Sequence, residues 1–450
     1  MRTFLLNKSN ILWILIPSIV YLLILFPNSY FRHDDWIIID EGVRTLHQWS
    51  LAFEPTAAHG YVRQPWFFRP FFKLGALSFL EIFGFHYYLW LSVCFGFFMA
   101  SIYLGAKALT FISSNQASSL WFTTLFATAF QLHLGSLIWI GEGLMNCPQL
   151  FLLSLSLYFF CMNRVPASKA QWASLIPFAL SLGFKESSLF HLFLLGGLVM
   201  GHPFWSRLKL KTRFGLLLPF GLVGLAYLLY RQIYVPTNPS YLLSLHWHNV
   251  PKSLLKLSAL HLLPFALYLL IVRPKKLTES YRGSQWLIPF ILLNTVPFIG
   301  HNFFSPGWLM VPGFFFLFCF CSYLPTDGTP IKKVAVSYLL CTLLLIGTAL
   351  YQSRWFTWKP AQVTFTEEIR NSSTEVETIF LHHCYGDYQL FSRVIGGKHS
   401  MESAWHAIHR TQPKIEIDNE CISFPKTPKQ LHLYWGAPKL LNHPETKEPT

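Results

Sequence analysis

The chain has few charged side chains. Asp, Glu, Lys and Arg together make up 12% of its 450 residues, which is about half the share found in a typical soluble domain. Apolar side chains make up 52% and aromatic ones 17%, with 43 Phe. So large an apolar share excludes a disordered chain, and the shortage of charge argues against a soluble globular enzyme. The composition is typical of a protein whose helices face lipid.

The signatures of several soluble enzyme classes are also absent. The sequence has no glycine-rich phosphate loop ending in Lys-Ser or Lys-Thr, no His-Glu-x-x-His and no paired Cys-x-x-Cys. The sequence therefore indicates neither an ATP-driven protein nor a zinc hydrolase. Most of the eight cysteines lie in apolar runs, where a thiol behaves as a small hydrophobe. Cys384 and Cys421 lie near the C-terminus and could pair in an oxidising compartment.

Long apolar stretches fill most of the first 351 residues. A bilayer core about 30 Å thick needs about 20 apolar residues in a helix. The candidate spans are 10–27, 85–107, 117–139, 144–162, 171–184, 187–201, 214–234, 253–272, 285–300, 308–324 and 333–351. The fifth and sixth are short and are separated only by Lys185-Glu186, so they form either a tight hairpin or one broken helix. We predict an all-α polytopic membrane protein with about 11 transmembrane helices.

The basic residues are unevenly distributed. The last 99 residues hold 11 basic and 11 acidic side chains, so the whole net charge of +14 belongs to the apolar part. With the N-terminus in the cytoplasm, the inner loops collect fifteen basic residues and two acidic ones. This is the positive-inside pattern, and it favours a lipid bilayer over nucleic acid as the partner. An odd number of spans places the C-terminal segment outside, and we expect a bacterial inner membrane.

Two segments are unlike membrane spans. The first is an outer loop at about 28–84, which is long, aromatic and rich in acidic residues, and loops of this length are usually functional. The second is the tail at 352–450, where strand-like runs at 378–381 and 430–435 alternate with a helix-like stretch at 401–410. We therefore divide the chain into a transmembrane domain at 1–351 and a small α/β extracytoplasmic domain at 352–450.

Two adjacent carboxylates, Asp34 and Asp35, follow the first span by a few residues. Such a pair can supply a general base or hold a divalent cation. Alternatively, an aspartate before Trp36 and three isoleucines caps a helix or lies in an exposed turn. The same loop interleaves Arg63 and Arg69 with aromatic rings. These cations either bind a phosphate or extend to lipid headgroups from an interfacial helix, which Pro70 would begin and which would run to about residue 83.

Other polar residues interrupt the apolar runs. Lys185-Glu186 lies between two apolar stretches, where a charged pair is costly unless it is paired or faces an aqueous cavity, although it also fits a plain tight turn. His133 inside the third predicted span and Glu142 just beyond it are weaker candidates. A lone histidine inside a span is more often a packing residue. His301, before the tenth span, either lines a cavity or caps a loop.

The order of these features resembles the GT-C superfamily of integral-membrane glycosyltransferases. Its members have a first span, a long outer loop that opens with an acidic pair, an Arg-Pro that begins an amphipathic helix, and a Phe-Gly before the second span. The corresponding residues here are His33-Asp34-Asp35-Trp36, Phe68-Arg69-Pro70-Phe71, Phe83-Gly84 and, later, Gly183-Phe184-Lys185-Glu186. The resemblance covers residues 10–200 in ordered detail and 201–351 only as apolar spans.

The resemblance implies sugar transfer from a polyprenyl-phosphate-linked donor to a hydroxyl acceptor at the outer membrane face, with inversion in a single displacement. Asp35, with Asp34 as second candidate, would deprotonate or orient the acceptor. Arg69, Lys185 and Arg63 would bind the donor phosphate. Further pocket candidates are His33, Glu186, His133 and His301. No cofactor is expected, although a divalent metal could bind the acidic pair.

One departure from the family pattern concerns the donor phosphate. Relatives often carry Arg-Tyr before a late Leu-Pro pair, whereas the corresponding stretch here, 306–312, contains no arginine. Another cation has to take that place. Two other functions remain open: a transporter or lipid flippase, and a non-catalytic membrane scaffold. Two matching halves, which many transporters show, are not visible in the sequence.

Overall fold

The structure is a computed structural model of the chain. It describes residues 8–25, 30–31, 34–44, 49–53, 69–113, 116–128, 137, 140–162, 168–234, 251, 310–323, 331–353, 359–383, 397–418, 427, 429–436 and 439–441.

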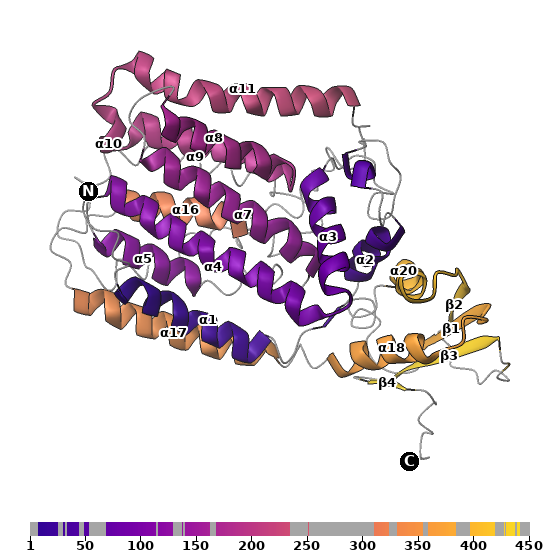
Figure 1. The fold of residues 1–450 in the computed structure, drawn as a ribbon. Coiled ribbons are helices and arrows are strands. Elements are labelled where there is room, and N and C mark those ends of the chain that lie inside the picture. The colour runs from indigo at the N-terminus through magenta and orange to yellow at the C-terminus, as the bar shows by residue number, and fades with distance from the viewer. Residues whose placement is uncertain are drawn as a thin grey trace.

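Most of the described chain forms a bundle of apolar helices (Figure 1). Three of them, α4 (Tyr87–Ile112), α7 (Ile140–Cys161) and α11 (Leu210–Tyr234), are long and apolar enough to cross a bilayer. The other helices of the bundle are α1 (Lys8–Leu25), α5 (Gln116–Ala127), α8 (Lys169–Leu182), α9 (Phe190–Gly201), α10 (Pro203–Ser206), α16 (Met310–Tyr323) and α17 (Ile331–Ser353). These features are those of an integral membrane protein.

Helix α7 lies at the centre of the bundle, packed against α4 and α8. It is mostly apolar, and most of its side chains are buried, as expected for a helix surrounded by others. Helix α11, in contrast, lies at the edge and exposes a row of leucines. High apolar content therefore characterises both the central helix of the bundle and the helix with an exposed apolar surface.

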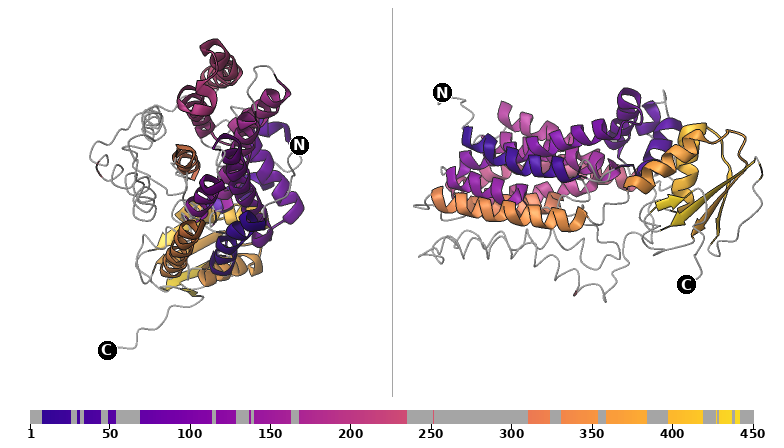
Figure 2. Two further views of the ribbon diagram at one scale, coloured as in Figure 1. Left: turned by 90° about the vertical axis from the view of Figure 1, so that its left-hand side faces the viewer. Right: turned by 90° about the horizontal axis from the view of Figure 1, so that it is seen from below.

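A second group of elements lies at one end of the bundle (Figures 1 and 2). Helix α2 (Asp34–Arg44), the 3-10 helix η2 (Trp49–Phe53) and helix α3 (Pro70–Phe83) come from the predicted outer loop. Helix α3 begins and ends where the sequence predicts, because the fixed backbone angle of Pro70 suits the first turn of a helix.

The tail forms the small α/β unit that the sequence predicts. A four-stranded sheet has the order β2-β1-β3-β4, with β1 (Thr378–His383) parallel to both β2 (Lys414–Asp418) and β3 (Gln430–Gly436). Strand β4 (Lys439–Leu441) pairs antiparallel with β3. Helices α18 (Lys359–Asn371) and α20 (Gly397–His409) precede β1 and β2, respectively, and α20 packs against α2.

The helices of the structure agree with the predicted spans wherever those spans are described. Each range that the structure describes contains a helix, and the two short ranges, 171–184 and 187–201, form separate helices, α8 and α9. Helix α7 starts at residue 140, four residues before the predicted span. The ranges 253–272 and 285–300 lie outside the described residues, so a total of 11 spans stays a prediction.

Candidate functional site

The N-terminal end of α7 is held by a carboxylate from α2. Asp35 accepts a hydrogen bond from the backbone N–H of Gly141 at 2.8 Å, and its side chain is buried. The first amides of a helix have no partner within the helix, and the helix dipole favours a negative charge there. A side chain at position 141 would collide with Ile38, since a Cβ atom there would lie 2.3 Å from Ile38 Cδ1. Glycine therefore permits the close approach of α2 to α7.

A second close approach brings α3 to the turn between α8 and α9. The N–H of Phe71 donates to the carbonyl of Gly183 at 3.0 Å, so this carbonyl caps the start of α3. A Cβ atom at Gly183 would lie 2.1 Å from the Phe71 ring. The contact places Arg69, at the N-cap of α3, directly above the Lys185-Glu186 pair.

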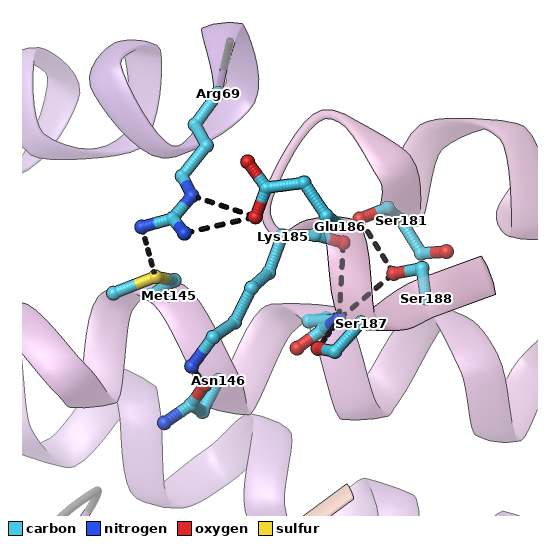
Figure 3. A network of polar contacts seen from close by, with 9 residues as sticks. Arg69, Met145, Asn146, Ser181, Lys185, Glu186, Ser187 and Ser188 are labelled. Atoms are coloured by element: carbon cyan, nitrogen blue, oxygen red, sulfur yellow. Dashed lines mark hydrogen bonds and ion pairs between the residues drawn. The ribbon is translucent and has the colours of Figure 1, made fainter. Parts of the chain in front are cut away.

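Arg69 and Glu186 form a buried ion pair (Figure 3). The guanidinium donates from Nη2 at 2.9 Å and from Nε at 3.3 Å to the same oxygen, Oε2 of Glu186. Its Nη1 lies 3.1 Å from Sδ of Met145 in α7. Both charged side chains are largely excluded from solvent, where an ion pair with good geometry holds its partners in one orientation.

Lys185 extends towards α7. Its Nζ donates to Oδ1 of Asn146 at 3.0 Å, and Nδ2 of Asn146 donates to Oε2 of Glu142 at 2.7 Å. Burial holds the pKa of Lys185 below its usual value, Glu142 acts in the opposite direction, and Arg69 lowers the pKa further. The ammonium is therefore close to both positive and negative groups in a partly dehydrated place.

Gln149 fixes the segment that carries the two charged residues. Its Nε2 donates to the hydroxyls of Ser187 and Ser188 at 2.9 and 2.8 Å, and also lies 3.3 Å from the carbonyl of Lys185. Ser188 in turn donates to the carbonyl of Ser181 at 2.9 Å. This network shapes the 3-10 helix η4 (Glu186–Leu189) and so sets the direction of the lysine and the glutamate.

We call Arg69, Glu142, Asn146, Lys185 and Glu186 the charged cluster. Its two cations and two carboxylates balance, and Asp35 adds a negative charge at the same end of α7, beside Gly141. Three regions of the sequence supply these groups: the outer loop with α2 and α3, the first turns of α7, and the turn after α8. Such a site combines proton acceptors with fixed cations for an anionic substrate.

The predicted site residues fall into two sets. Asp35, Arg69, Lys185 and Glu186 lie at one end of α7. Asp34 begins α2, but the position of its side chain is not described. The remaining candidates, His33, Arg63, His133 and His301, lie outside the described residues, as do Cys384 and Cys421.

Two residues of the site had no place in the sequence prediction. Asn146 and Gln149 lie on α7, four and seven residues after Glu142. That spacing puts all three on one face of a helix, and a polar face on an otherwise apolar helix is a signal that could have found them. The described residues contain no group of three or more His, Cys, Asp or Glu side chains arranged to hold a metal ion.

The fold of the chain matches a known structure. It is similar to the crystal structure of ArnT from Cupriavidus metallidurans bound to undecaprenyl phosphate, with a TM-score of 0.50 and 11% sequence identity over 93% of this chain and 87% of that chain. No family model matches the sequence, and the search of curated proteins finds no match. The structural likeness runs along nearly the whole of both chains. The chain therefore shares the fold of that protein.

Proposed function

We propose that the chain is a membrane glycosyltransferase that moves a sugar from a polyprenyl-phosphate-linked donor to a hydroxyl acceptor at the extracytoplasmic face. The observation that carries this proposal is the meeting of Asp35, Arg69 and Lys185 at one end of α7. The similar fold of a protein whose structure holds undecaprenyl phosphate supports the class of donor.

Lys185 and Arg69 are the proposed partners of the donor phosphate. As the bond between sugar and phosphate breaks, negative charge develops on the departing lipid phosphate, and fixed cations in a dehydrated site stabilise it strongly. Among the described residues, the Lys185 ammonium donates one hydrogen bond, to Asn146. An ammonium has three N–H bonds, so two of those of Lys185 can donate to a ligand. Glu186 holds the Arg69 guanidinium in place through two of its N–H groups. Arg63 remains a third candidate.

Asp35 is the proposed base, with Asp34 as the second candidate. The Gly141 N–H fixes one carboxylate oxygen of Asp35 and so orients the other. An amide N–H and a helix N-terminus both stabilise the negative charge of a carboxylate, and in this proposal Asp35 accepts the proton of an acceptor hydroxyl. The hydroxyl oxygen then attacks the sugar carbon as the lipid phosphate departs with its bonding electron pair. No step in this scheme needs a cofactor, and we propose that none is used.

Sugar transfer by the purified full-length chain tests the proposal. The protein in lipid nanodiscs is mixed with labelled hexoses or pentoses on undecaprenyl phosphate, with lipids and glycans extracted from the host membrane as acceptors. We expect label to move to an acceptor in a reaction that chelator does not stop. Absence of transfer from every donor, together with movement of the lipid phosphate between leaflets of sealed vesicles, would show a flippase instead.

A further inference from the structure

Helix α2, which carries both aspartates, is held at three points. Near its start, Asp35 binds the Gly141 N–H of α7. Near its end, Gly42 packs on α3, since a Cβ atom there would lie 3.3 Å from Leu80. Between these two points, Asp40 is held by the tail. The first two contacts belong to the membrane part of the chain, whereas the third comes from a separate unit.

The contact with the tail is a short, buried hydrogen bond. Nδ1 of His406 in α20 lies 2.5 Å from Oδ1 of Asp40, and a carboxylate oxygen can only accept, so the ring donates. The two side chains are 15% and 6% exposed, so little water competes for the bond. Asp40 follows Asp35 by five residues on the same 11-residue helix. Any shift of Asp40 is therefore passed to Asp35 through about one and a half turns of helix.

His406 is presented by a firmly held helix. The neighbouring Trp405 is fully buried, and its indole N–H donates to Thr411 at 2.9 Å. One turn later, His409 bonds the carbonyl of Ile369 in α18 at 2.5 Å. The helix that carries His406 is thus bonded to α18 and packs against β2 of the tail.

A second helix of the tail lies near the same loop. Tyr30, just before α2, is partly buried, and its hydroxyl is within electrostatic reach of Arg370 and Glu367 in α18. Burial raises the pKa of Tyr30, and Arg370 acts against this rise. Helix α20 therefore packs against α2, and α18 lies near Tyr30, just before α2.

We infer that the tail acts as a positioning unit for sugar transfer, with His406 holding α2, and hence Asp35, in the geometry that the reaction needs. His406 is a positioning residue and does not touch the substrate. The inference rests on the proposed function. A misplacement of a catalytic group by about 1 Å can reduce a rate about a hundredfold, so one such contact can decide the activity.

Substitutions of His406 test this role in the full-length protein. His406→Leu removes the N–H donor, whereas His406→Asn keeps an amide N–H at the position of Nδ1. The matched control is Glu377→Gln, which removes an exposed ion pair with Lys429 within the tail. For each variant we would measure turnover, the KM for an undecaprenyl-phosphate sugar, and the hydrogen exchange of the α2 amides.

We expect His406→Leu to reduce kcat by about ten- to a hundredfold, with the donor KM changed by less than about twofold, because the cations are untouched. Exchange in α2 should become faster in this variant only, and His406→Asn should recover most of the rate. Wild-type turnover and exchange in His406→Leu would overturn the inference, as would equal losses in the Leu and Asn variants with α2 exchange unchanged. If the wild-type protein transfers no sugar, the proposed function fails, and α2 exchange alone still decides whether His406 positions the helix.

Discussion

Helix α7 carries two polar clusters that differ in charge. The charged cluster lies at its first turns and joins α7 to Arg69 and Lys185. Further along the helix, Ser156 meets Ser174 of α8 and His191 of α9, and we call these three residues the neutral cluster. Both clusters tie α7 to other helices, but only the first contains Lys, Arg and Glu side chains.

The contacts of the neutral cluster hold three helices together. Ser156 Oγ lies 3.1 Å from His191 Nε2, and Ser174 donates to the carbonyl of Ser156 at 2.7 Å. All three side chains are fully buried, and the histidine ring lies near the rings of Phe178 and Phe315. Hydrogen bonds of this kind join helices in a membrane. The comparison shows two uses of polar residues in an apolar helix. In the neutral cluster they join helices, and at the start of α7 they gather charges of both signs, where we propose the reactive site.

Loss of the proposed base should have the largest effect. Asp35→Asn keeps an oxygen that can accept the Gly141 N–H, so the start of α7 is preserved, but the amide takes no proton. We expect sugar transfer to fall by about 10²–10⁴-fold. The matched control, Glu81→Gln, removes an exposed carboxylate from α3 and should leave the rate unchanged. Normal transfer by a correctly inserted Asp35→Asn protein would remove Asp35 from the mechanism, and Asp34→Asn would then be measured.

Loss of the lysine in the charged cluster comes next. Lys185→Met keeps the length of the side chain without its charge, and we expect transfer to fall by about 10²–10³-fold, as when one donor to a developing negative charge is removed. Lys169→Met, at an exposed position on α8, is the control. An equal, small loss in both variants would show that Lys185 serves only to hold Asn146.

A smaller loss is expected for Arg69→Lys. An ammonium cannot make both of the bonds that Nε and Nη2 make to Glu186, so the cation is held less firmly. We expect a loss of about tenfold in kcat/KM for the donor, equivalent to about 1.4 kcal/mol. Arg207→Lys, at an exposed site near α10, should have no effect. Unchanged donor use by Arg69→Lys would exclude the guanidinium from donor binding.

The lowered pKa of Lys185 predicts a pH limit. Phosphate binding needs the protonated ammonium, so donor use should decline as pH rises through a value below the usual lysine range. Lys185→Arg should move this limit to higher pH, because a guanidinium stays protonated. The measurement is kcat/KM against pH for the two proteins. The same alkaline limit in both would assign it to a different group.

The smallest effect is expected from the neutral cluster. Ser156→Ala removes its bond to His191 and should lower the free energy of unfolding by about 0.6 kcal/mol, with an upper range of about 1.7 kcal/mol. Thermal unfolding in detergent measures this change. The rate of sugar transfer should stay at the wild-type level. A large loss of transfer at unchanged stability would place the neutral cluster in the mechanism and erase the distinction between the two clusters.

The local parts of the fold could be predicted from the sequence. The apolar runs predicted the helices of the bundle, and Pro70 predicted the start of α3. Each of these signals lies within the segment that forms the helix, so no distant contact is needed to recognise it. Strand-like runs predicted β1 and β3. Strand β2 was missed because it is short and three of its five residues are charged, and α18 was missed because its sequence is largely polar.

The site itself could be predicted only as separate residues. Asp35 and Gly141 are 106 positions apart, and Arg69 and Glu186 are 117 apart, so no local pattern connects them. The two glycines that allow these approaches, Gly141 and Gly183, have no signature until the opposite side chain is seen. Likewise, the contact between Asp40 and His406 joins two units that the sequence shows only as an outer loop and a tail.

An experimental density map of the full-length protein with a bound undecaprenyl-phosphate sugar tests the central claim most directly. We predict that the phosphate contacts Lys185 and Arg69 at the start of α7, with the sugar between the phosphate and the carboxylate of Asp35. A phosphate bound elsewhere, such as along the exposed leucines of α11, with the charged cluster unchanged and empty, would contradict the account.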